Sequence, residues 1–298
     1  MQQIRLAENF RAVFYAPFYA AIALGYCARE GVDIQLVESA TPGAGTQGLL
    51  DGTLDVTWGG PMRVMKARDE GGPPLVCFCE VVRRDPFYLV GRKHGTAPFR
   101  LADLSSLRLA SVSEVPTPWL CLQHDLREAG IDPASLSRLA DRTMGDNLEA
   151  LRRGELDVIQ VFEPYAGLAE RQGLGEILYA QSSRGETSYT TLLALRPGVE
   201  SNRNAFAAVV RAMGTMQQWL AEHGGRELAT VVAPYYPSLD RDVLATALAR
   251  YERAKLWATD PKVSPVGFQR LAVSLQSGGF ISKLPTYEDC VVDDLVSS

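Results

Sequence analysis

The sequence predicts an α/β protein built from two similar lobes, and three ordered repeats carry that prediction. The run Gly-Thr-Leu-Asp-Val-Thr-Trp-Gly-Gly-Pro at 52–61 returns about one hundred residues later as Gly-Glu-Leu-Asp-Val-Ile-Gln-Val-Phe-Glu-Pro at 154–164. Two shorter runs return at similar offsets and in the same order: Ile4-Arg5-Leu6-Ala7 as Leu107-Arg108-Leu109-Ala110, and 29–33 as 127–132. Two α/β lobes of one plan, with a cleft between them, suit the binding of a small molecule.

The first lobe alternates strand-like and helix-like segments. The first helix is expected to start at Pro17 and to stop before Gly31, since proline suits a first turn and glycine suits a helix end. Such alternation predicts a mostly parallel sheet with helices on both faces. Strands are expected at 3–7, 32–37, 54–58 and 75–80, and helices at 16–30, at 46–51 and from Gly59-Gly60-Pro61 to Gly71-Gly72.

The same pattern restarts in the second lobe after a short spacer helix at 100–104. Beyond Ser201 the chain reads as helical. Strands are expected at 107–112, 136–140, 156–161 and 176–179, and helices at 117–129, 145–153, 164–171, 203–222, 226–232, 238–253 and 264–277.

Two segments are expected to cross between the lobes. The strand-like run 87–92 would leave lobe 1, and the run 189–195 would return to it. We therefore expect lobe 1 to comprise 1–90 with 195–298, lobe 2 to comprise 91–194, and hinges near 88–93 and 188–195. Two crossings make a hinge that opens and closes with little freedom to twist.

Composition narrows the class of protein. The 298 residues allow two cores of ordinary size, and 46% hydrophobic with 22% charged residues are globular values. A net charge of −5 argues against a nucleic-acid partner. No apolar stretch reaches the ~18 residues of a membrane span. The five cysteines form neither a metal signature nor a full disulfide framework, so no metal is expected. The sequence contains no Walker loop and no G-x-G-x-x-G motif, and no cofactor is expected.

Several motifs resemble one known family. Ala16-Pro17-Phe18-Tyr19-Ala20-Ala21, then Gly25-Tyr26 and 30–34, are similar to the opening of periplasmic solute-binding proteins of the nitrate, sulfonate, taurine and thiamin-pyrimidine-precursor type. The 52–61 run and Phe162-Glu163-Pro164-Tyr165 resemble two further segments of that family. Gly278-Gly279-Phe280-Ile281 with Pro285-x-Tyr287-Glu288-Asp289 resembles its C-terminal ending.

The resemblance implies the type II periplasmic-binding-protein fold with two hinge strands. It also implies a monomer that binds a small organic solute, sulfonate- or taurine-like, aromatic or aminopyrimidine, and delivers it to an ABC transporter permease. The chain departs from the family in showing no export signal before its first strand. The family implies the periplasm, whereas a native start at Met1 would imply the cytoplasm.

Candidate ligand-binding residues lie where strands end and helices begin, because ligands of open α/β sheets bind there and helix N-termini offer free N–H groups. In the loop after the first strand, Asn9 and Arg11 would donate hydrogen bonds, and Phe14 and Tyr15 would form a flat wall. After the third strand, Trp58 would stack on a planar ligand, and Gly59-Gly60-Pro61 would let the backbone approach it. For the first loop, the alternative is that its aromatic residues only pack against the first helix. For the turn after the third strand, the alternative is a tight turn without a ligand.

The second lobe offers two comparable places. Ser113, Glu114, Thr117 and Trp119 surround the start of its first helix, where pure helix capping is the alternative. Phe162 and Glu163 precede a later helix, where Glu163 would accept hydrogen bonds from an amine or would only stabilise the helix N-terminus.

Arg83 and Tyr189 are further candidates near the expected hinges. Together these side chains predict an aromatic pocket with polar groups of both signs, which suits a planar or amino-bearing organic molecule better than a bare inorganic anion.

An enzyme on the same fold is the alternative function. A desulfinase-like enzyme would need a cysteine in the loop after the first strand, but Asn9-Phe10-Arg11-Ala12 contains none. A thiamin-pyrimidine synthase-like enzyme would need a lysine, a histidine and a cysteine-rich loop. Cys77-Phe78-Cys79 and Lys66 match that pattern faintly, and no histidine lies near Lys66 in the sequence. The sequence therefore favours a binding protein with no catalytic residue.

Overall fold

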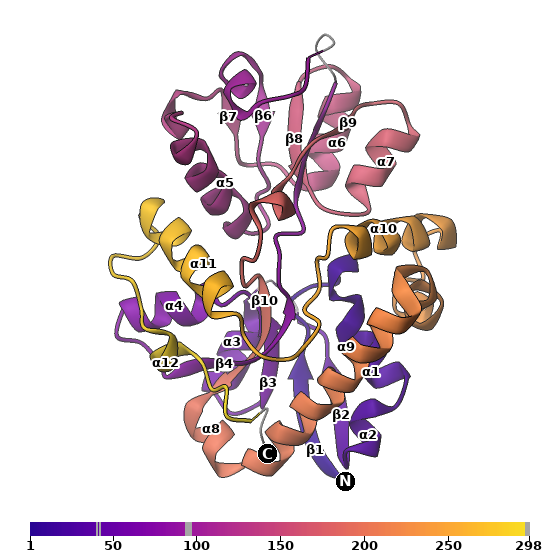
Figure 1. The fold of residues 1–298 in the computed structure, drawn as a ribbon, viewed down its shortest axis with the longest axis vertical. Helices are drawn as coiled ribbons and strands as arrows, with labels where there is room; N and C mark the ends of the chain where they lie inside the picture. Colours follow the sequence, from indigo (N-terminus) through magenta and orange to yellow (C-terminus); the bar gives the residue numbers. More distant parts are fainter. Residues whose placement is uncertain (40, 42, 93–96, 296–298) are drawn as a thin grey trace. The chain divides into compact units, whose positions relative to one another are not determined.

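The computed structural model describes residues 1–39, 41, 43–92 and 97–295, which form two compact units (Figure 1). Unit 1 comprises Met1–Arg84 and Glu186–Ser298, and unit 2 comprises Asp85–Gly185. Each unit contains one five-stranded sheet. No helix in the described ranges is both long and apolar enough to cross a membrane.

The sheet of unit 1 has the strand order β2-β1-β3-β10-β4, and only β10 runs antiparallel to its neighbours. Every residue of β3 and β4 is buried. A sheet covered on both faces produces such continuous apolar runs. The strands are β1 (Gln2–Ala7), β2 (Val32–Val37), β3 (Val56–Gly59), β4 (Leu75–Val82) and β10 (Thr190–Leu195).

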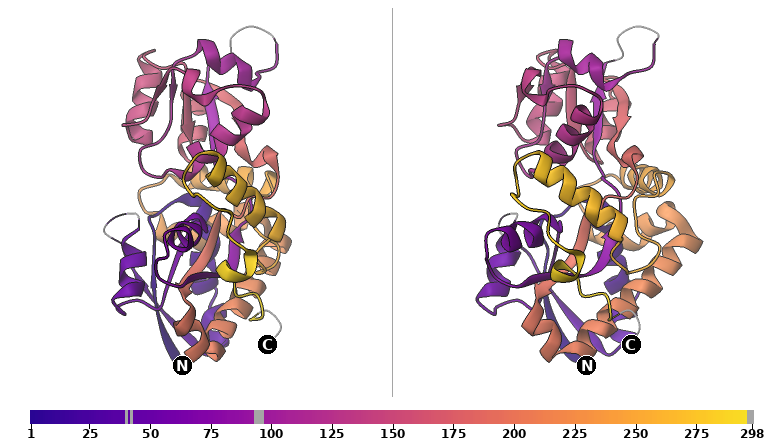
Figure 2. Two further views of the ribbon diagram at one scale, coloured as in Figure 1. Left: turned by 90° about the vertical axis from the view of Figure 1, so that its left-hand side faces the viewer. Right: turned by 60° about the vertical axis from the view of Figure 1, so that its left-hand side comes forward.

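Helices cover both faces of this sheet. Figure 1 shows α1, α2 and α9 on one side and α4, α11 and α12 on the other, and Figure 2 shows α11 and α12 beside α4. The helices of unit 1 are η1 (Val13–Tyr15), α1 (Ala16–Ala23), α2 (Tyr26–Arg29), α3 (Ala44–Leu50), α4 (Met62–Asp69), α8 (Arg196–Ser201), α9 (Arg203–Val232), η5 (Ala233–Tyr235), α10 (Arg241–Arg253), α11 (Pro265–Ser277) and α12 (Tyr287–Cys290).

Glycines interrupt two of these helical stretches. The single helix expected at 16–30 is broken at Gly25, whose φ of 72° is left-handed and separates α1 from α2. The two helices expected at 203–222 and 226–232 lie within α9 and are separated by a kink at Gly224, whose φ of 78° and ψ of 176° are not helical, so the expected break is confirmed. The short helices α8 and α12 were not expected, since one turn leaves little periodic signal.

Unit 2 repeats the strand order of unit 1 as β7-β6-β8-β5-β9, with β5 as the antiparallel strand. Figure 1 shows α5 on one side of this sheet and α6 and α7 on the other. The elements are β5 (Tyr88–Gly91), η2 (Leu101–Ser106), β6 (Leu109–Ala110), α5 (Thr117–Glu128), η3 (Pro133–Ser135), β7 (Arg138–Leu139), α6 (Met144–Arg152), β8 (Val158–Val161), α7 (Tyr165–Arg171), β9 (Glu176–Ala180) and η4 (Gln181–Arg184).

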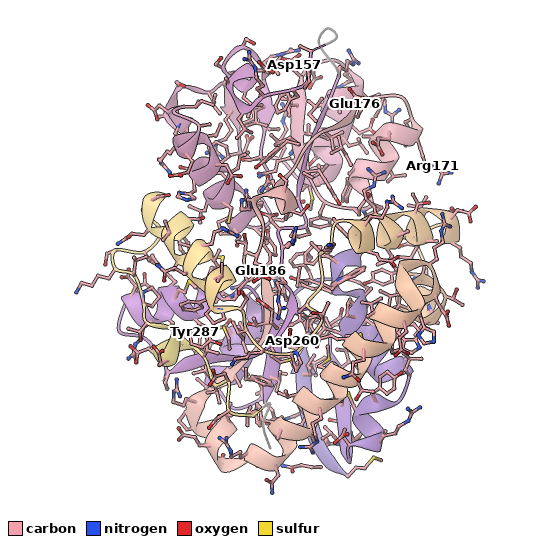
Figure 3. All side chains as sticks on the ribbon, viewed as in Figure 1. Asp157, Arg171, Glu176, Glu186, Asp260 and Tyr287 are labelled. Atoms are coloured by element: carbon pink, nitrogen blue, oxygen red, sulfur yellow. The ribbon has the colours of Figure 1, made fainter. Side chains whose placement is uncertain are left out.

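The repeated sequence has one repeated structure at the amino ends of the central strands. Arg5 donates to Asp55 from its backbone N (2.8 Å), Nε (3.0 Å) and Nη2 (2.8 Å). Arg108 donates to Asp157 from the same three atoms at 2.8, 2.9 and 2.8 Å. Asp157 is labelled in Figure 3. The two matching Arg–Asp pairs show why Arg and Leu-Asp-Val recur together in the sequence.

We expect Asp55→Asn to lower the free energy of unfolding at pH 7 by about 1–3 kcal/mol, because charge-assisted hydrogen bonds to Arg5 are lost. Burial raises the pKa of Asp55, but the hydrogen bonds from Arg5 outweigh it and hold that pKa below 3.8. The contribution is therefore complete above the unfolded-state pKa and is lost as the pH falls through the lower folded-state pKa. Urea unfolding of the wild type and of Asp55→Asn between pH 7 and pH 3 measures this loss. The prediction is contradicted if the two free energies of unfolding differ by the same amount at every pH.

The connections between the units differ from the expected hinges. Because β5 pairs with β8 and β9, it belongs to the sheet of unit 2, and because β10 pairs with β3 and β4, it belongs to unit 1. The boundaries therefore fall after Arg84 and Gly185 instead of after residues 90 and 194. Residue 93, at the end of the first expected hinge, lies outside the described residues. A hinge motion stays a prediction.

Candidate functional site

A polar cluster lies at the carboxyl ends of β1 and β3 in unit 1. Asn9 follows β1 and is 6% exposed, and its Oδ1 accepts hydrogen bonds from the backbone N of Gly43 (3.0 Å) and from Nη2 of Arg63 (3.4 Å). The side chains of Asn9 and Thr190 also interact with buried Tyr15. Burial raises the pKa of Tyr15 to about 12, although Asn9 and Arg63 act against that rise. The phenol is therefore neutral at physiological pH and can donate a hydrogen bond.

The Gly59-Gly60-Pro61 turn brings the backbone close to its neighbours. A Cβ on Gly59 would lie 3.3 Å from Leu193 Cδ1, and a Cβ on Gly60 would lie 3.4 Å from the carbonyl oxygen of Tyr189. Pro61 comes directly before α4 with φ −53°, which is already helical. Glycines are needed here for packing, and the same turn places the start of α4 beside Asn9.

Two of the predicted ligand-contacting aromatic residues lie in the core of unit 1. Trp58 is 1% exposed, stacks on Phe18 at 4.5 Å with 12° between the rings, and meets Tyr19 edge-on at 5.4 Å. Phe14 is also 1% exposed and meets Tyr189 edge-on at 6.3 Å. Protein atoms cover both rings.

Two predicted arginines are committed to ion pairs within unit 1. Arg11 lies 2.5 Å from Glu8 and 2.9 Å from Glu38, and hydrogen bonds from Arg11 hold the buried Glu8. Arg83 lies 2.6 Å from Glu80 and 3.0 Å from Asp260, which Figure 3 labels, and it also donates to two carbonyl oxygens. These contacts account for the charge of each arginine without a ligand.

In unit 2, the candidates near the ends of β6 and β8 have contacts within that unit. Oε1 of Glu114 accepts a hydrogen bond from the backbone N of Met144, the first residue of α6, at 2.9 Å. Ser113 Oγ lies 3.5 Å from Glu114 Oε2. Burial, and secondarily the charge of Glu114, raise the pKa of Tyr165, so these two groups are neighbours.

Glu163 and Phe162 support the start of α7. Glu163 is 1% exposed, and its Oε2 accepts a hydrogen bond from the backbone N of Gly167 at 2.9 Å. Phe162 meets Phe87 edge-on at 5.1 Å. The helix-stabilising alternative for Glu163 therefore has a direct structural basis, while a ligand role stays a prediction.

Thr117 and Trp119 belong to the first turn of α5. Thr117 is the first helical residue and is 6% exposed. Trp119 packs against a hydrophobic cluster that includes Leu89 and Leu109, and the Arg138 guanidinium lies 4.1 Å from its ring centroid. These contacts give Trp119 a packing role in unit 2.

The structure thus gathers part of the predicted set in each unit. In unit 1 it brings together Asn9, Tyr15, Gly59, Gly60, Pro61 and Tyr189. In unit 2 it places Glu114 beside Tyr165 and the start of α6. Sequence reasoning missed Arg63 and Thr190 in the first group and Tyr165 in the second. Arg63 had a signal, since it is a cation in the first turn of a helix that follows Gly-Gly-Pro.

The cysteines and the lysine named for the enzyme alternative have structural surroundings of their own. All five cysteines are buried and free, and burial raises the pKa of Cys77 and of Cys79, which keeps these thiols protonated. Lys66 forms an ion pair with Glu70 at 3.1 Å on the surface of α4. No group of three or more potential metal-binding side chains occurs within the described ranges.

Comparison with solved structures defines the class of fold. The chain is similar to the periplasmic aliphatic sulphonate binding protein SsuA from Escherichia coli, with a TM-score of 0.76 and 17% identity over 100% of both chains. It is also similar to the desulfurization enzyme DSZB, with a TM-score of 0.71 and 11% identity over 100% of this chain and 98% of that one. Both likenesses show the periplasmic-binding-protein fold and confirm the expected fold class.

The family follows from the sequence. Residues 9–233 match the NMT1-like family, so the chain belongs to it. The protein YtlA of Bacillus subtilis (strain 168) is 23% identical over 295 residues, which cover 98% of this chain and 88% of YtlA. The family expected from the motifs is thereby confirmed.

Proposed function

We propose that this chain is the solute-binding component of an ABC import system and that it binds a small organic solute. The observation that carries the proposal is the polar cluster of Asn9, Tyr15 and Arg63 at the carboxyl ends of β1 and β3. This is the edge of an open α/β sheet where ligands bind. The family and the likeness to SsuA support a transport role.

The chemistry of the cluster suits an organic solute with a polar head. Tyr15 offers a neutral phenol, Asn9 an amide and Arg63 a guanidinium, all within one unit. In unit 2 we propose Ser113, Glu114, Phe162 and Glu163 as further contacts, on the ground of their positions at strand ends. Sulfonate- or taurine-like, aromatic and aminopyrimidine solutes are the classes we propose. A permease partner, a monomeric state and a periplasmic location belong to the same proposal.

An enzyme on this fold is the second candidate, because DSZB shares the fold. The protonated cysteines and the surface ion pair of Lys66 count against it. A binding protein returns its ligand unchanged, whereas an enzyme does not.

A thermal-shift screen tests the proposal. The pure protein is heated with taurine, alkyl and aryl sulfonates, aminopyrimidines, aromatic carboxylates and nitrate. A ligand at 100 times its Kd stabilises the folded state by about 2.7 kcal/mol, which raises Tm measurably. We expect a shift with an organic solute that mass spectrometry recovers unchanged. A chemically altered solute would favour the enzyme, and no shift with any compound would contradict solute binding.

We expect Asn9→Ala to weaken binding of the solute with the largest shift by about 10-fold, because one amide hydrogen-bonding group is lost and the Gly43 backbone N loses its acceptor. Isothermal titration calorimetry measures the change. Asn204→Ala, at an exposed position of α9, is the matched control and should bind normally. If Asn9→Ala and Asn204→Ala bind the solute with equal affinity, Asn9 does not contact the solute.

A further inference from the structure

Arg63 is a half-buried cation for which the described residues supply no carboxylate within 4.0 Å. It is the second residue of α4, directly beyond the Gly59-Gly60-Pro61 turn. Within the described part of the chain, its guanidinium donates to a side chain at Asn9, where Nη2 lies 3.4 Å from Oδ1. That acceptor is neutral, so it does not balance the charge.

Other arginines of unit 1 show the usual arrangement. Arg5, Arg11 and Arg83 each lie within 3.0 Å of a carboxylate. Their pKa values are raised by hydrogen bonds and charge from those partners. Burial lowers the pKa of Arg63 and no carboxylate in the described ranges offsets it, whereas for Arg83 the leading effect of burial is outweighed by Asp260 and Glu80. A partly buried, unbalanced cation is unfavourable for the protein alone and needs an explanation.

Glycines make room for the guanidinium. A Cβ on Gly43 would lie 2.7 Å from Nη1, and a Cβ on Gly59 would lie 3.6 Å from Nε. The side chain of Arg63 thus lies beside the backbone at two separate places, Gly43 before α3 and Gly59 at the end of β3. A side chain at Gly43 would displace the guanidinium from this place.

The groups around Arg63 are neutral. Tyr15, whose phenol is protonated, interacts electrostatically with Arg63, and Asn9 and Thr190 interact with that phenol in turn. A carboxylate or sulfonate placed here would gain hydrogen bonds from the guanidinium and meet no described negative charge among these neighbours.

We propose that Arg63 is the counter-ion for an acidic group of the solute, a carboxylate or a sulfonate, and that it selects acids over their neutral analogues. This inference rests on the proposed function and adds a specificity-determining residue to it. A site arranged around a charged partner rejects the analogue that lacks the charge, because the buried group is then left unpaired.

Matched acid and amide probes test the inference. Calorimetry compares benzenesulfonate with benzenesulfonamide and benzoate with benzamide, using the wild type, Arg63→Gln and Arg63→Lys. We expect the wild type to bind one acid at least about 30-fold more tightly than its amide. Arg63→Gln should abolish that preference and leave amide binding unchanged, and Arg63→Lys should keep part of it. Arg127→Gln, at an exposed residue of α5 whose side chain donates to Gln123, should match the wild type.

The stability of Arg63→Gln without solute gives an independent readout. A structural ion pair would be lost with a clear fall in Tm, whereas removal of an unbalanced cation should leave Tm unchanged or raise it. A clear fall would therefore overturn the inference, as would equal wild-type affinity for acid and amide, or unchanged acid binding by Arg63→Gln. Failure of every acid probe, with binding of a neutral or cationic solute, would also overturn it but leave the proposed function intact. Failure of all solutes would reject the proposed function itself.

Discussion

Arg184→Met is expected to lower the free energy of unfolding of unit 2 by about 3–5 kcal/mol, because it leaves buried carboxylates without their cation. The Arg184 side chain is 6% exposed and lies 2.6 Å from Asp85, which is 0% exposed. Its Nε lies 3.0 Å from Asp125, on α5. Asp85 and Arg184 lie next to the two boundaries of unit 2, so this pair joins the first and last segments of the unit.

The acid–base state of Asp85 sets the size of the effect. Burial raises the pKa of Asp85 even with Arg184 beside it. Without Arg184 the carboxyl group can take up a proton, which would limit the loss. The double variant Asp85→Asn with Arg184→Met should therefore recover part of the lost stability. The free energy of unfolding that the double variant loses, compared with the sum of the losses in the two single variants, measures the coupling between Asp85 and Arg184.

Urea unfolding followed by circular dichroism measures this prediction, with separate transitions assigned if the units unfold independently. Arg127→Met is the matched control, since the Arg127 side chain is exposed and donates to Gln123, and it should change stability by less than about 0.5 kcal/mol. An Arg184→Met protein as stable as this control would show that the triad of Arg184, Asp85 and Asp125 contributes nothing net.

The second large effect is expected in unit 1, where Trp58→Ala should cost about 3–5 kcal/mol. The indole is 1% exposed and packs between Phe18 and Tyr19, so truncation leaves a cavity in the aromatic core. A ligand-stacking residue would behave differently, because its removal would weaken binding and leave the free protein stable.

Two further variants separate these roles. Trp219→Ala removes a half-buried indole that stacks on His223 at 4.6 Å, and a smaller loss of about 1–2 kcal/mol is expected there. Trp58→Phe keeps an aromatic ring in the core, so it should fold and bind solute with nearly normal affinity. Weak binding by a stable Trp58→Phe protein would restore the ligand role of Trp58.

Local patterns predicted most strands and helices because their signals are short-range. The strand expected at 75–80 forms most of the wholly buried β4, and Pro17 and Gly31 mark the ends of the segment that holds α1 and α2 as expected. Gly25 was misread, since one glycine inside a helical pattern can be either tolerated or an interruption. The strands β5 and β10 were read as connectors because their pairing partners lie far away in the sequence.

The candidate site was predictable in position but not in composition. The predicted ends of the first and third strands indicated Asn9, Tyr15 and the Gly59-Gly60-Pro61 turn as candidates. The structure brings these groups together in unit 1. The direction of each side chain was not predictable. Trp58 and Arg63 are only five positions apart, yet Trp58 lies in the core and Arg63 lies beside Asn9.

The sequence by itself determined the two-unit α/β plan and the family, because ordered repeats and local periodicity record both. Only the tertiary structure decided which charges are balanced: Arg5 and Arg108 meet carboxylates about fifty residues away, while Arg63 meets none in the described ranges. The physical reason is that charge pairing and burial depend on contacts between distant segments, and a one-residue change of register reverses which side chains face inward.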